Sequence, residues 1–397
     1  MSARRKQPSP APEPGLRPAA RVRRLRLANF RSYRDADLAF GAGPVVFLGE
    51  NGAGKTNILE AISFLAPGRG LRRATLEDAA ASDGDGSWAV ASTVEGAEGE
   101  VQLGTGIDAP LAGETPSRRL RIAQENVASS TQFAEHLRVV WLVPEMDGLF
   151  LGPAGERRRF LDRLVLAIDA GHSARVSAFE RALRSRNRLL EEGVSDARYL
   201  DAVEHEVAEL AVAVAAARAE CVERLRAEID AAHDPDSLFP AAGLSLDGWM
   251  EKAVRDAPAI EVEDKYRAVL RESRERDRAA GRTLDGPHRS DLVLTHRIKN
   301  IPAAQASTGE RKALLVGVVI SHARLVAAMH GFAPVMLLDD VAAFLDAARR
   351  DALFGLLARF GAQVFMTGVD ESSFRALGKS AERFLVTPGK VLPMSGS

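Results

Sequence analysis

The chain has 397 residues, of which 46% are hydrophobic, and this is enough for packed cores in two or three domains. Its 53 basic and 54 acidic residues leave a formal net charge of −1, so any DNA-binding surface must be local. The single cysteine, Cys221, excludes an internal disulfide and a cysteine-built zinc site, and its apolar helical setting indicates a small core residue.

The N-terminus is basic and rich in Pro and Ala over residues 1–20, which is typical of a disordered arm. Such an arm either solubilises the chain or touches phosphates. Within residues 1–26, Glu13 is the only acidic residue. The basic residues of this stretch are Arg4, Arg5, Lys6, Arg17, Arg21, Arg23, Arg24 and Arg26.

Neither a membrane span nor a secretion signal is expected. We find no apolar run that approaches the eighteen or so residues a span needs, and the basic N-terminus lacks the apolar segment of a signal peptide. The sequence therefore predicts a cytoplasmic protein without a membrane partner.

Residues 21–149 read as short strands and turns around a phosphate-binding loop. The apolar run 45–48 predicts a strand, and apolar residues at helical spacing after Thr56 predict a helix. In such a loop the backbone amides cradle phosphates, Lys55 reaches the β- and γ-phosphates, and Thr56 can hold magnesium. A purely structural Gly-rich turn is the alternative, which the strand-to-helix context disfavours. The predicted loop residues are Gly49, Glu50, Asn51, Gly52, Ala53, Gly54, Lys55, Thr56 and Asn57.

Residues 150–280 have long-helix composition, rich in Arg, Glu, Ala and Leu, and we expect them to form a helical insertion. Apolar residues at alternating steps of four and three predict a helix seam, facing Phe179, Leu183 and Leu190. Both a short coiled coil and an ordinary helical hairpin packed within a domain fit this pattern. The seam residues are Val203, Val207, Leu210, Val214, Ala217 and Cys221.

Strand and turn character returns in residues 281–397, where "STGERK" (307–312) opens a predicted helix. Ser307 and Glu310 match a capping box, so the helix should begin here with free amides and its dipole pointing outward. This second anion site is not needed by a nucleotide already held at 49–56. The economical explanation is a symmetric dimer, in which each of two ATP molecules lies between one subunit's loop and the other's helix.

The apolar strand "PVMLL" (334–338) ends in Asp339 and Asp340. A carboxylate at this position holds magnesium through water, and its neighbour can polarise the attacking water. The pair could instead cap the helix that follows. Because about 285 residues separate the two halves of the nucleotide site, the sequence predicts an α/β nucleotide domain split by a large helical excursion.

The combination resembles the ABC-type ATPases of chromosome maintenance, and it looks most like the RecF family. The resemblance covers most of the chain and implies an ABC-type P-loop ATPase head, split into residues 21–149 and 281–397, with the helical insertion between them. The segments that carry it are "LRLANFRSY" (25–33), "GENGAGKTNILEAISFLAPGRGLR" (49–72), "VPEMDGLFLGPAGERRRFLDRL" (143–164), "GPHRSDL" (286–292), "STGERKALL" (307–315), "MLLDDVAAFLD" (336–346) and "QVFMTGVD" (363–370).

The resemblance also implies a role for each matching residue. Lys55 and Thr56 would bind phosphate and Mg²⁺, and Asp339 would be the magnesium carboxylate. Asp340 would be the catalytic carboxylate, acting with Lys55. Further expectations from the family are that Ser307 and Gly309 act across the dimer, that Asp346 lies near the dimer interface, and that Arg31 lies near the nucleotide.

The implied function is recombinational gap repair and replication restart. In the family, ATP binding closes a homodimer on gapped or junction DNA, slow hydrolysis reopens it as a switch, and RecR and RecO act with it to load the RecA recombinase. Arginines of the helical insertion are candidate DNA contacts, although a solvated helix face explains any one of them as well: Arg181, Arg184, Arg186 and Arg188.

Several positions depart from the family pattern. Arg311 stands where Gln is usual, Ala343 and Phe344 replace a Ser-Glu pair, and Gly368 replaces a hydroxyl residue. A glutamine-loop equivalent is not assigned. Three other readings remain open, namely another ABC/SMC-type DNA-maintenance ATPase, a P-loop phosphotransferase acting on a small molecule, and the nucleotide-binding subunit of an ABC transporter.

Overall fold

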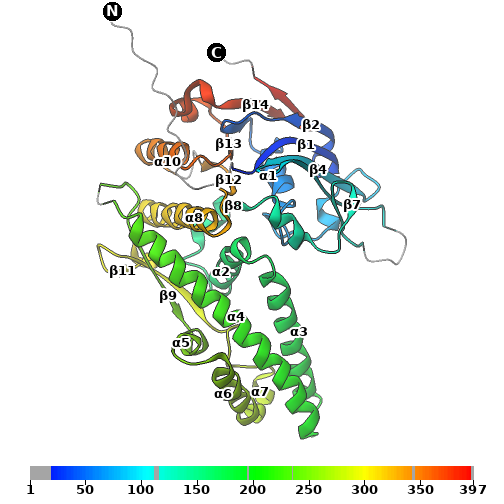
Figure 1. Ribbon diagram of the computed structural model, residues 1–397, viewed down its shortest axis with the longest axis vertical. Coiled ribbons are helices and arrows are strands. Elements are labelled where there is room, and N and C mark those ends of the chain that lie inside the picture. Colours follow the sequence, from blue (N-terminus) through cyan, green and yellow to red (C-terminus); the bar gives the residue numbers. More distant parts are fainter. Residues whose placement is uncertain (1–18, 111–115, 195, 235, 342–344, 395–397) are drawn as a thin grey trace, which may run out of the picture. The chain divides into compact units, whose positions relative to one another are not determined.

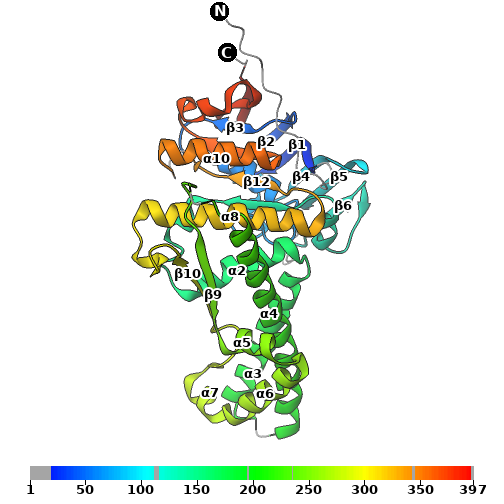
Figure 2. The same ribbon diagram turned by 60° about the vertical axis from the view of Figure 1, so that its left-hand side comes forward.

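The computed structural model describes residues 19–110, 116–194, 196–234, 236–341 and 345–394. The predicted arm at 1–20 lies almost wholly outside these residues, as do Ala343 and Phe344. The chain divides into two compact units, the first comprising Met1–Pro144 with Ala323–Ser397 and the second comprising Glu145–His322. Figures 1 and 2 show both units, each of which is described by itself here.

The first unit contains two six-stranded sheets. In the antiparallel sheet, buried and exposed residues alternate along its strands, as expected where one face packs on a core. Its strands in order are β2 (Tyr33–Ala39), β1 (Arg21–Phe30), β4 (Trp88–Gly96), β5 (Gly99–Ile107), β6 (Arg119–Ile122) and β7 (Glu125–Asn126).

The second sheet of this unit is mainly parallel and carries the phosphate loop. The strands β3, β12 and β8 are buried at every position, which is typical of parallel strands covered on both faces. Two helices of this unit are α1 (Lys55–Ser63) and α10 (Ala347–Phe360). The strand order is β15 (Lys390–Pro393), β14 (Glu382–Thr387), β3 (Val45–Leu48), β13 (Val364–Gly368), β12 (Val335–Leu338) and β8 (Val139–Leu142).

The second unit is largely helical and includes a small antiparallel sheet in the order β11-β10-β9. Figures 1 and 2 both show β9 running beside α4. Its elements are α2 (Ala154–Ile168), α3 (His172–Glu191), α4 (Ala197–Ala231), β9 (Ala242–Asp247), α5 (Trp249–Asp256), α6 (Ala259–Glu272), α7 (Arg274–Ala280), β10 (Asp291–His296), β11 (Ile301–Pro302) and most of α8 (Thr308–His330).

The predicted boundary at residue 280 differs from this division, because β10 pairs with β9 along its whole length, from Asp291 opposite Asp247 to His296 opposite Ala242. The second unit continues beyond this strand to His322. The division of the head at residues 149 and 280 therefore stays a prediction, and the compact units have other bounds.

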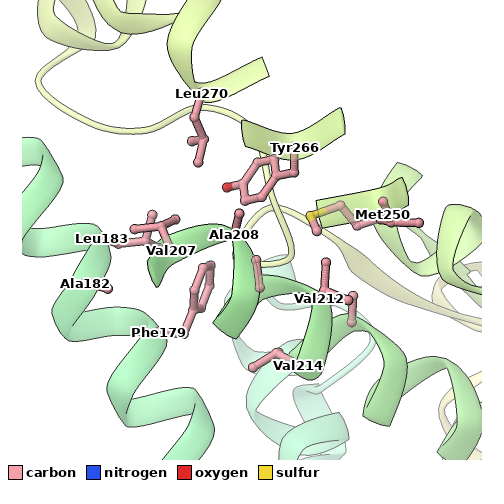
Figure 3. Close-up of a cluster of buried hydrophobic side chains, with 13 residues drawn as sticks. Phe179, Ala182, Leu183, Val207, Ala208, Val212, Val214, Met250, Tyr266 and Leu270 are labelled. Carbon is pink, nitrogen blue, oxygen red and sulfur yellow. The ribbon is translucent and has the colours of Figure 1, made fainter. Parts of the chain in front are cut away.

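The predicted helix seam packs as a hairpin within a domain rather than as a free coiled coil. Phe179 and Leu183 of α3 contact Val207 of α4 in one buried cluster, as predicted (Figure 3). The same cluster takes Met250 from α5 and Tyr266 from α6, so α4 is covered on more than one side. Cys221 is 3% exposed, which agrees with a core position.

The burial of Arg186 contradicts both interpretations of this residue, as a candidate DNA contact and as part of a solvated helix face. Its side chain is fully buried and its guanidinium donates to Glu204 at 3.0 Å and to Asp277 at 2.8 Å. It also donates to the Thr283 hydroxyl and to the Leu270 carbonyl. The helical composition gave no sign of this inward orientation. The other three candidates, Arg181, Arg184 and Arg188, are exposed.

One described helix, α8, is long and apolar enough to cross a membrane by length and composition, and this corrects the expectation that no segment approaches that length. However, 72% of the most apolar stretch of α8 is buried within the protein. A core helix has the same composition, so α8 is weak evidence for a membrane span.

Candidate functional site

The phosphate loop lies on the predicted strand-to-helix turn, between β3 and α1. Gly54 precedes α1 with φ 105°, a left-handed conformation that favours glycine. A Cβ there would lie 2.7 Å from the Ser32 hydroxyl and 2.9 Å from the Tyr33 hydroxyl. At Gly49 a Cβ would lie 2.2 Å from the Val386 carbonyl oxygen. Both glycines are therefore required by close packing around the loop.

Lys55 directs its ammonium group into this loop. Its Nζ donates to the carbonyl oxygens of Gly49 at 2.7 Å and Glu50 at 2.8 Å, and the residue is 8% exposed. Burial lowers the pKa of Lys55, and the charges of Asp340 and Asp339 act in the opposite direction. The two aspartates thus lie close enough to Lys55 to act on its charge.

The parallel sheet brings distant segments of the site together. Neighbouring strands in the order β3-β13-β12 end at the same edge, where Leu48 is opposite Gly368 and Met366 is opposite Leu338. Ligands of open α/β sheets bind at this carboxyl edge. The predicted pairing of the phosphate loop with the acidic strand follows from this strand order.

Asp339 is held by two hydroxyl groups at that edge. The Thr56 hydroxyl lies 2.9 Å from both carboxylate oxygens, and the Thr367 hydroxyl donates to Oδ1 at 2.7 Å. Thr367 also accepts from the amide of Asp340 at 2.7 Å, and Asp340 has φ 48°. Asp339 is 6% exposed, whereas Asp340 is only partly buried. The pair is thereby separated into a buried carboxylate beside Thr56 and a second, more accessible one.

This donor set fits Mg²⁺. The Thr56 hydroxyl and the Asp339 carboxylate are hard oxygen donors, which Mg²⁺ prefers. The described residues contain no group of three or more His, Cys, Asp or Glu that could hold a metal ion. A magnesium ion at Thr56 and Asp339 would therefore take its other ligands from phosphate oxygens and water, as it usually does in nucleotide sites.

The long helix that follows the acidic strand, α10, is not capped by the acidic pair. Asp346 is the N-cap of α10, and its carboxylate accepts from the amide of Arg349 at 2.9 Å. Whether Asp346 lies near a dimer interface stays a prediction.

Arg31 lies next to α1, in the turn between β1 and β2. Its guanidinium binds both carboxylate oxygens of the buried Glu60, at 2.9 and 2.7 Å, and also donates to the Asp78 carbonyl. Arg72 bridges Glu60 to Asn57 of the loop, at 3.0 and 2.7 Å. These bonds give Arg31 a part in holding α1, and a direct contact with nucleotide stays a prediction.

Three residues of the site were not singled out from the sequence. Thr367 holds both aspartates, Tyr33 donates to the Gly54 carbonyl at 3.0 Å, and Ser32 accepts from Asn57 at 2.9 Å. All three lie inside segments that resemble the family, "QVFMTGVD" and "LANFRSY". That resemblance was the available signal, but only the strand order gives them their contacts.

Close packing against Phe374 explains why residue 368 is a glycine. A Cβ at this position would lie 2.5 Å from Cε2 of Phe374, whose ring is fully buried. The aromatic side chain therefore fills the space that a hydroxyl residue would need, which accounts for this departure from the family pattern.

In the second unit, "STGERK" forms the predicted capping box at the start of α8. The Ser307 amide donates to Glu310 Oε2 at 3.0 Å, and the Glu310 amide lies 3.4 Å from the Ser307 hydroxyl. Residues 307–309, here called the signature turn, are exposed. Arg311 folds back onto this turn, where it donates to the Ala306 carbonyl at 2.7 Å and to the Thr308 hydroxyl at 3.1 Å.

Known proteins resemble the chain along most of its length. The family model described as RecF/RecN/SMC N terminal domain matches residues 21–389. The DNA replication and repair protein RecF of Mesorhizobium japonicum is 52% identical over 373 residues, which are 94% of this chain and 97% of that protein. The RecF of Brucella abortus is 49% identical over 371 residues, covering 93% and 95%.

Solved structures share the fold. The recombination mediator protein RecF-ATPrS of the RecFOR pathway has a TM-score of 0.84 at 21% identity and covers 96% of this chain and 100% of its own. An Smc head domain from Pyrococcus furiosus has a TM-score of 0.52 at 16% identity, covering 95% and 96%. The predicted fold, an ABC-type P-loop ATPase head with a largely helical second domain, is confirmed. Because the family model matches most of the chain and curated relatives are about half identical to it, this chain belongs to the RecF family of DNA replication and repair proteins.

Proposed function

We propose that this chain is an ATP-dependent DNA-binding ATPase of recombinational gap repair and replication restart. The observation that carries the proposal is the network at the sheet edge, in which the Thr56 hydroxyl and the Thr367 hydroxyl both bind Asp339. This network joins the phosphate loop to the acidic strand, two segments 283 residues apart. A structural Gly-rich turn would not need a buried carboxylate opposite Thr56.

The residues divide the chemistry between them. Bound Mg²⁺ would neutralise phosphate charge, and Thr56 and Asp339 would hold it. Lys55 would bind the β- and γ-phosphates, and Asp340 would orient the attacking water from its position beside Asp339. Hydrolysis is proposed to be slow, so that it works as a switch rather than as a motor.

The signature turn supports a symmetric ATP-dependent homodimer. Ser307 and Gly309 lie exposed at the start of α8, where the amides of the first turn and the helix dipole favour an anion. We propose that this anion is the γ-phosphate of a nucleotide held by the other subunit, so that binding of two ATP molecules closes the dimer.

Membership of the family supports the biological setting. Related proteins are DNA replication and repair proteins, and a neighbour of the same fold is described as a recombination mediator in the RecFOR pathway. We propose the cytoplasm as location, gapped or junction DNA as substrate, RecR and RecO as partners, and help in loading RecA as the outcome. Contacts to DNA should be mainly to phosphates and hence steeply dependent on salt. The exposed arginines Arg181, Arg184 and Arg188 remain candidates for these phosphate contacts.

Sedimentation of the wild-type chain and of Asp340→Asn, with fluorescent gapped DNA and with or without ATP and magnesium, tests the proposal. We expect ATP to produce a dimer that carries the DNA, and the dimer of the variant to persist longer because hydrolysis is blocked. A chain that stays monomeric and ignores DNA would contradict the proposal and would favour a phosphotransferase that acts on a small molecule.

A further inference from the structure

The signature turn has a neighbour that the proposed function does not use, the turn between β10 and β11. This hairpin pairs His296 with Ile301, and its turn presents Lys299, whose side chain is 51% exposed. The Lys299 ammonium lies 2.5 Å from Oε1 of Glu310, the residue that closes the capping box of α8. A basic side chain from a separate element therefore reaches the start of α8.

The two oxygens of the Glu310 carboxylate are divided between different partners. Oε1 binds Lys299, whereas Oε2 accepts from the Ser307 amide at 3.0 Å and from the Ser307 hydroxyl at 2.9 Å. Hydrogen bonds from Lys299 and from Ser307 lower the pKa of Glu310 to about 2, so the carboxylate is charged at neutral pH. Lys299 thus fixes the orientation in which Glu310 caps the turn.

A free carboxylate at this position would oppose phosphate binding. Glu310 stabilises the helix start, but its negative charge lies beside exposed donors that are proposed to meet a γ-phosphate, and like charges repel. The Glu310 carboxylate also accepts a hydrogen bond from the Ser307 hydroxyl, which must turn away to donate to a phosphate. An ammonium group on Oε1 offsets that charge and weakens its hold on the hydroxyl.

We propose that Lys299 is a positioning residue of the signature turn, which holds Glu310 as the cap while offsetting its charge, so that the turn can bind a phosphate of the opposing subunit. This inference rests on the proposed ATP-driven dimer. Arg311 contacts the turn through Ala306 and Thr308, whereas Lys299 pairs with Glu310.

The test compares Lys299→Ala, Lys299→Arg, Glu310→Gln and the double variant Lys299→Ala/Glu310→Gln. Glutamine keeps a capping-box acceptor without the charge. Lys252→Ala is the matched control, because Lys252 is an exposed lysine of the same unit, paired with Asp247 at 3.6 Å. Two quantities are measured for each variant, namely binding of a fluorescent ATP analogue to the monomer and the dissociation constant of the ATP-driven dimer by sedimentation.

Binding of the analogue should be unchanged, because the phosphate loop belongs to the other unit. One exposed ion pair changes an equilibrium by about two- to fivefold, and a symmetric dimer contains the turn twice, so Lys299→Ala should raise the dimer dissociation constant about 4- to 25-fold. Lys299→Arg should restore it to within about twofold, and Lys252→Ala should leave it unchanged. In the Glu310→Gln background, loss of Lys299 should add nothing.

If the wild type dimerises and Lys299→Ala has the same dimer dissociation constant, this inference is overturned and the proposed function stays intact. Equal losses in the Glu310 and Glu310→Gln backgrounds would also overturn it, because Lys299 would then not act through Glu310. A wild-type chain that binds the analogue but never dimerises would overturn the proposed function together with the inference.

Discussion

Single side chains at the sheet edge set the chemistry of the site. Asp339 and Asp340 are neighbours in sequence, yet the first is 6% exposed between two threonine hydroxyls and the second is more accessible. Thr367 joins them, because its hydroxyl donates to Asp339 and accepts from the Asp340 amide. One hydroxyl group therefore fixes where both carboxylates lie.

Thr367→Val tests this role, since valine has nearly the same shape and no hydroxyl. We expect the rate of ATP hydrolysis to fall about 10- to 100-fold, as when a group that orients a metal ligand is removed. The affinity for ATP should change less, because the loop is intact. Steady-state phosphate release and nucleotide binding measure the two effects. Thr387→Val, at an exposed position of β14, is the control, and wild-type turnover in Thr367→Val would disprove the role.

At the scale of elements, buried ion pairs hold the helices of the second unit together. Arg186 of α3 binds Glu204 of α4 and Asp277 of α7 with no exposed surface of its own. Arg218 of α4 binds Asp162 of α2 through both oxygens, at 2.8 and 2.9 Å, and His172 of α3 binds the same carboxylate at 2.9 Å. Each network joins two consecutive helices to a third helix farther along the chain.

Arg186→Met should destabilise the second unit by about 3–5 kcal/mol, because it leaves buried carboxylates without their partner. Arg184→Met, on the exposed side of the same helix, should change stability by less than about 0.5 kcal/mol. Urea unfolding followed by circular dichroism gives both values. If the two variants unfold at the same urea concentration, the buried network does not carry the stability assigned to it.

The lowered pKa of Asp162 should make the stability of the second unit depend on pH in acid. Burial acts to raise the pKa of Asp162, but hydrogen bonds from His172 and Arg218 outweigh it and hold the pKa at about 2, below the ordinary 3.8. The pKa of Asp162 is lower in the folded protein than in the unfolded chain. The charged carboxylate therefore stabilises the fold fully above pH 3.8, and this contribution is lost as the pH falls towards 2. It amounts to about 2 kcal/mol.

Urea midpoints of the wild type and of Asp162→Asn between pH 2 and 6 measure this dependence. The wild type should lose stability below pH 3.8 faster than the variant, so that the two converge near pH 2. A constant difference over the whole range would mean that the Asp162 carboxylate is not held in its charged form.

For the whole molecule, ligand binding should act on one unit first. The phosphate loop, Asp339 and Thr367 all belong to the unit formed by Met1–Pro144 and Ala323–Ser397. At a ligand concentration 100 times its dissociation constant, ATP with magnesium should stabilise this unit by about 2.7 kcal/mol and raise its thermal midpoint by about 5–10 °C. Calorimetry measures the shift, which Lys55→Ala should abolish. An equal shift in Lys55→Ala would show that the nucleotide binds elsewhere.

The sequence was sufficient for features that depend on residues close together in the chain. The phosphate loop, the capping box of Ser307 and Glu310, and the apolar seam of α4 are local patterns, and each is present in the structure. The acidic strand was also found, because a phosphate loop requires a carboxylate partner.

Features that depend on distant pairing could not be found in the same way. Thr367 approaches Asp339 only because β13 lies next to β12, and Asp291 extends the second unit only because β10 pairs with β9. Arg186 looked like a surface residue, since an arginine in a helix is usually solvated and its carboxylate partners lie up to 91 residues away. Such contacts follow from the topology rather than from the local pattern.

The lone, buried Cys221 makes the chain well suited to site-specific labelling. Burial raises the pKa of its thiol to about 12, so almost none of the reactive thiolate form is present at neutral pH. A cysteine introduced at an exposed position should therefore be the one that a maleimide dye modifies in the native protein. Donor and acceptor dyes could then be attached without first removing the natural cysteine, and the approach of two subunits could be followed in real time as energy transfer between them.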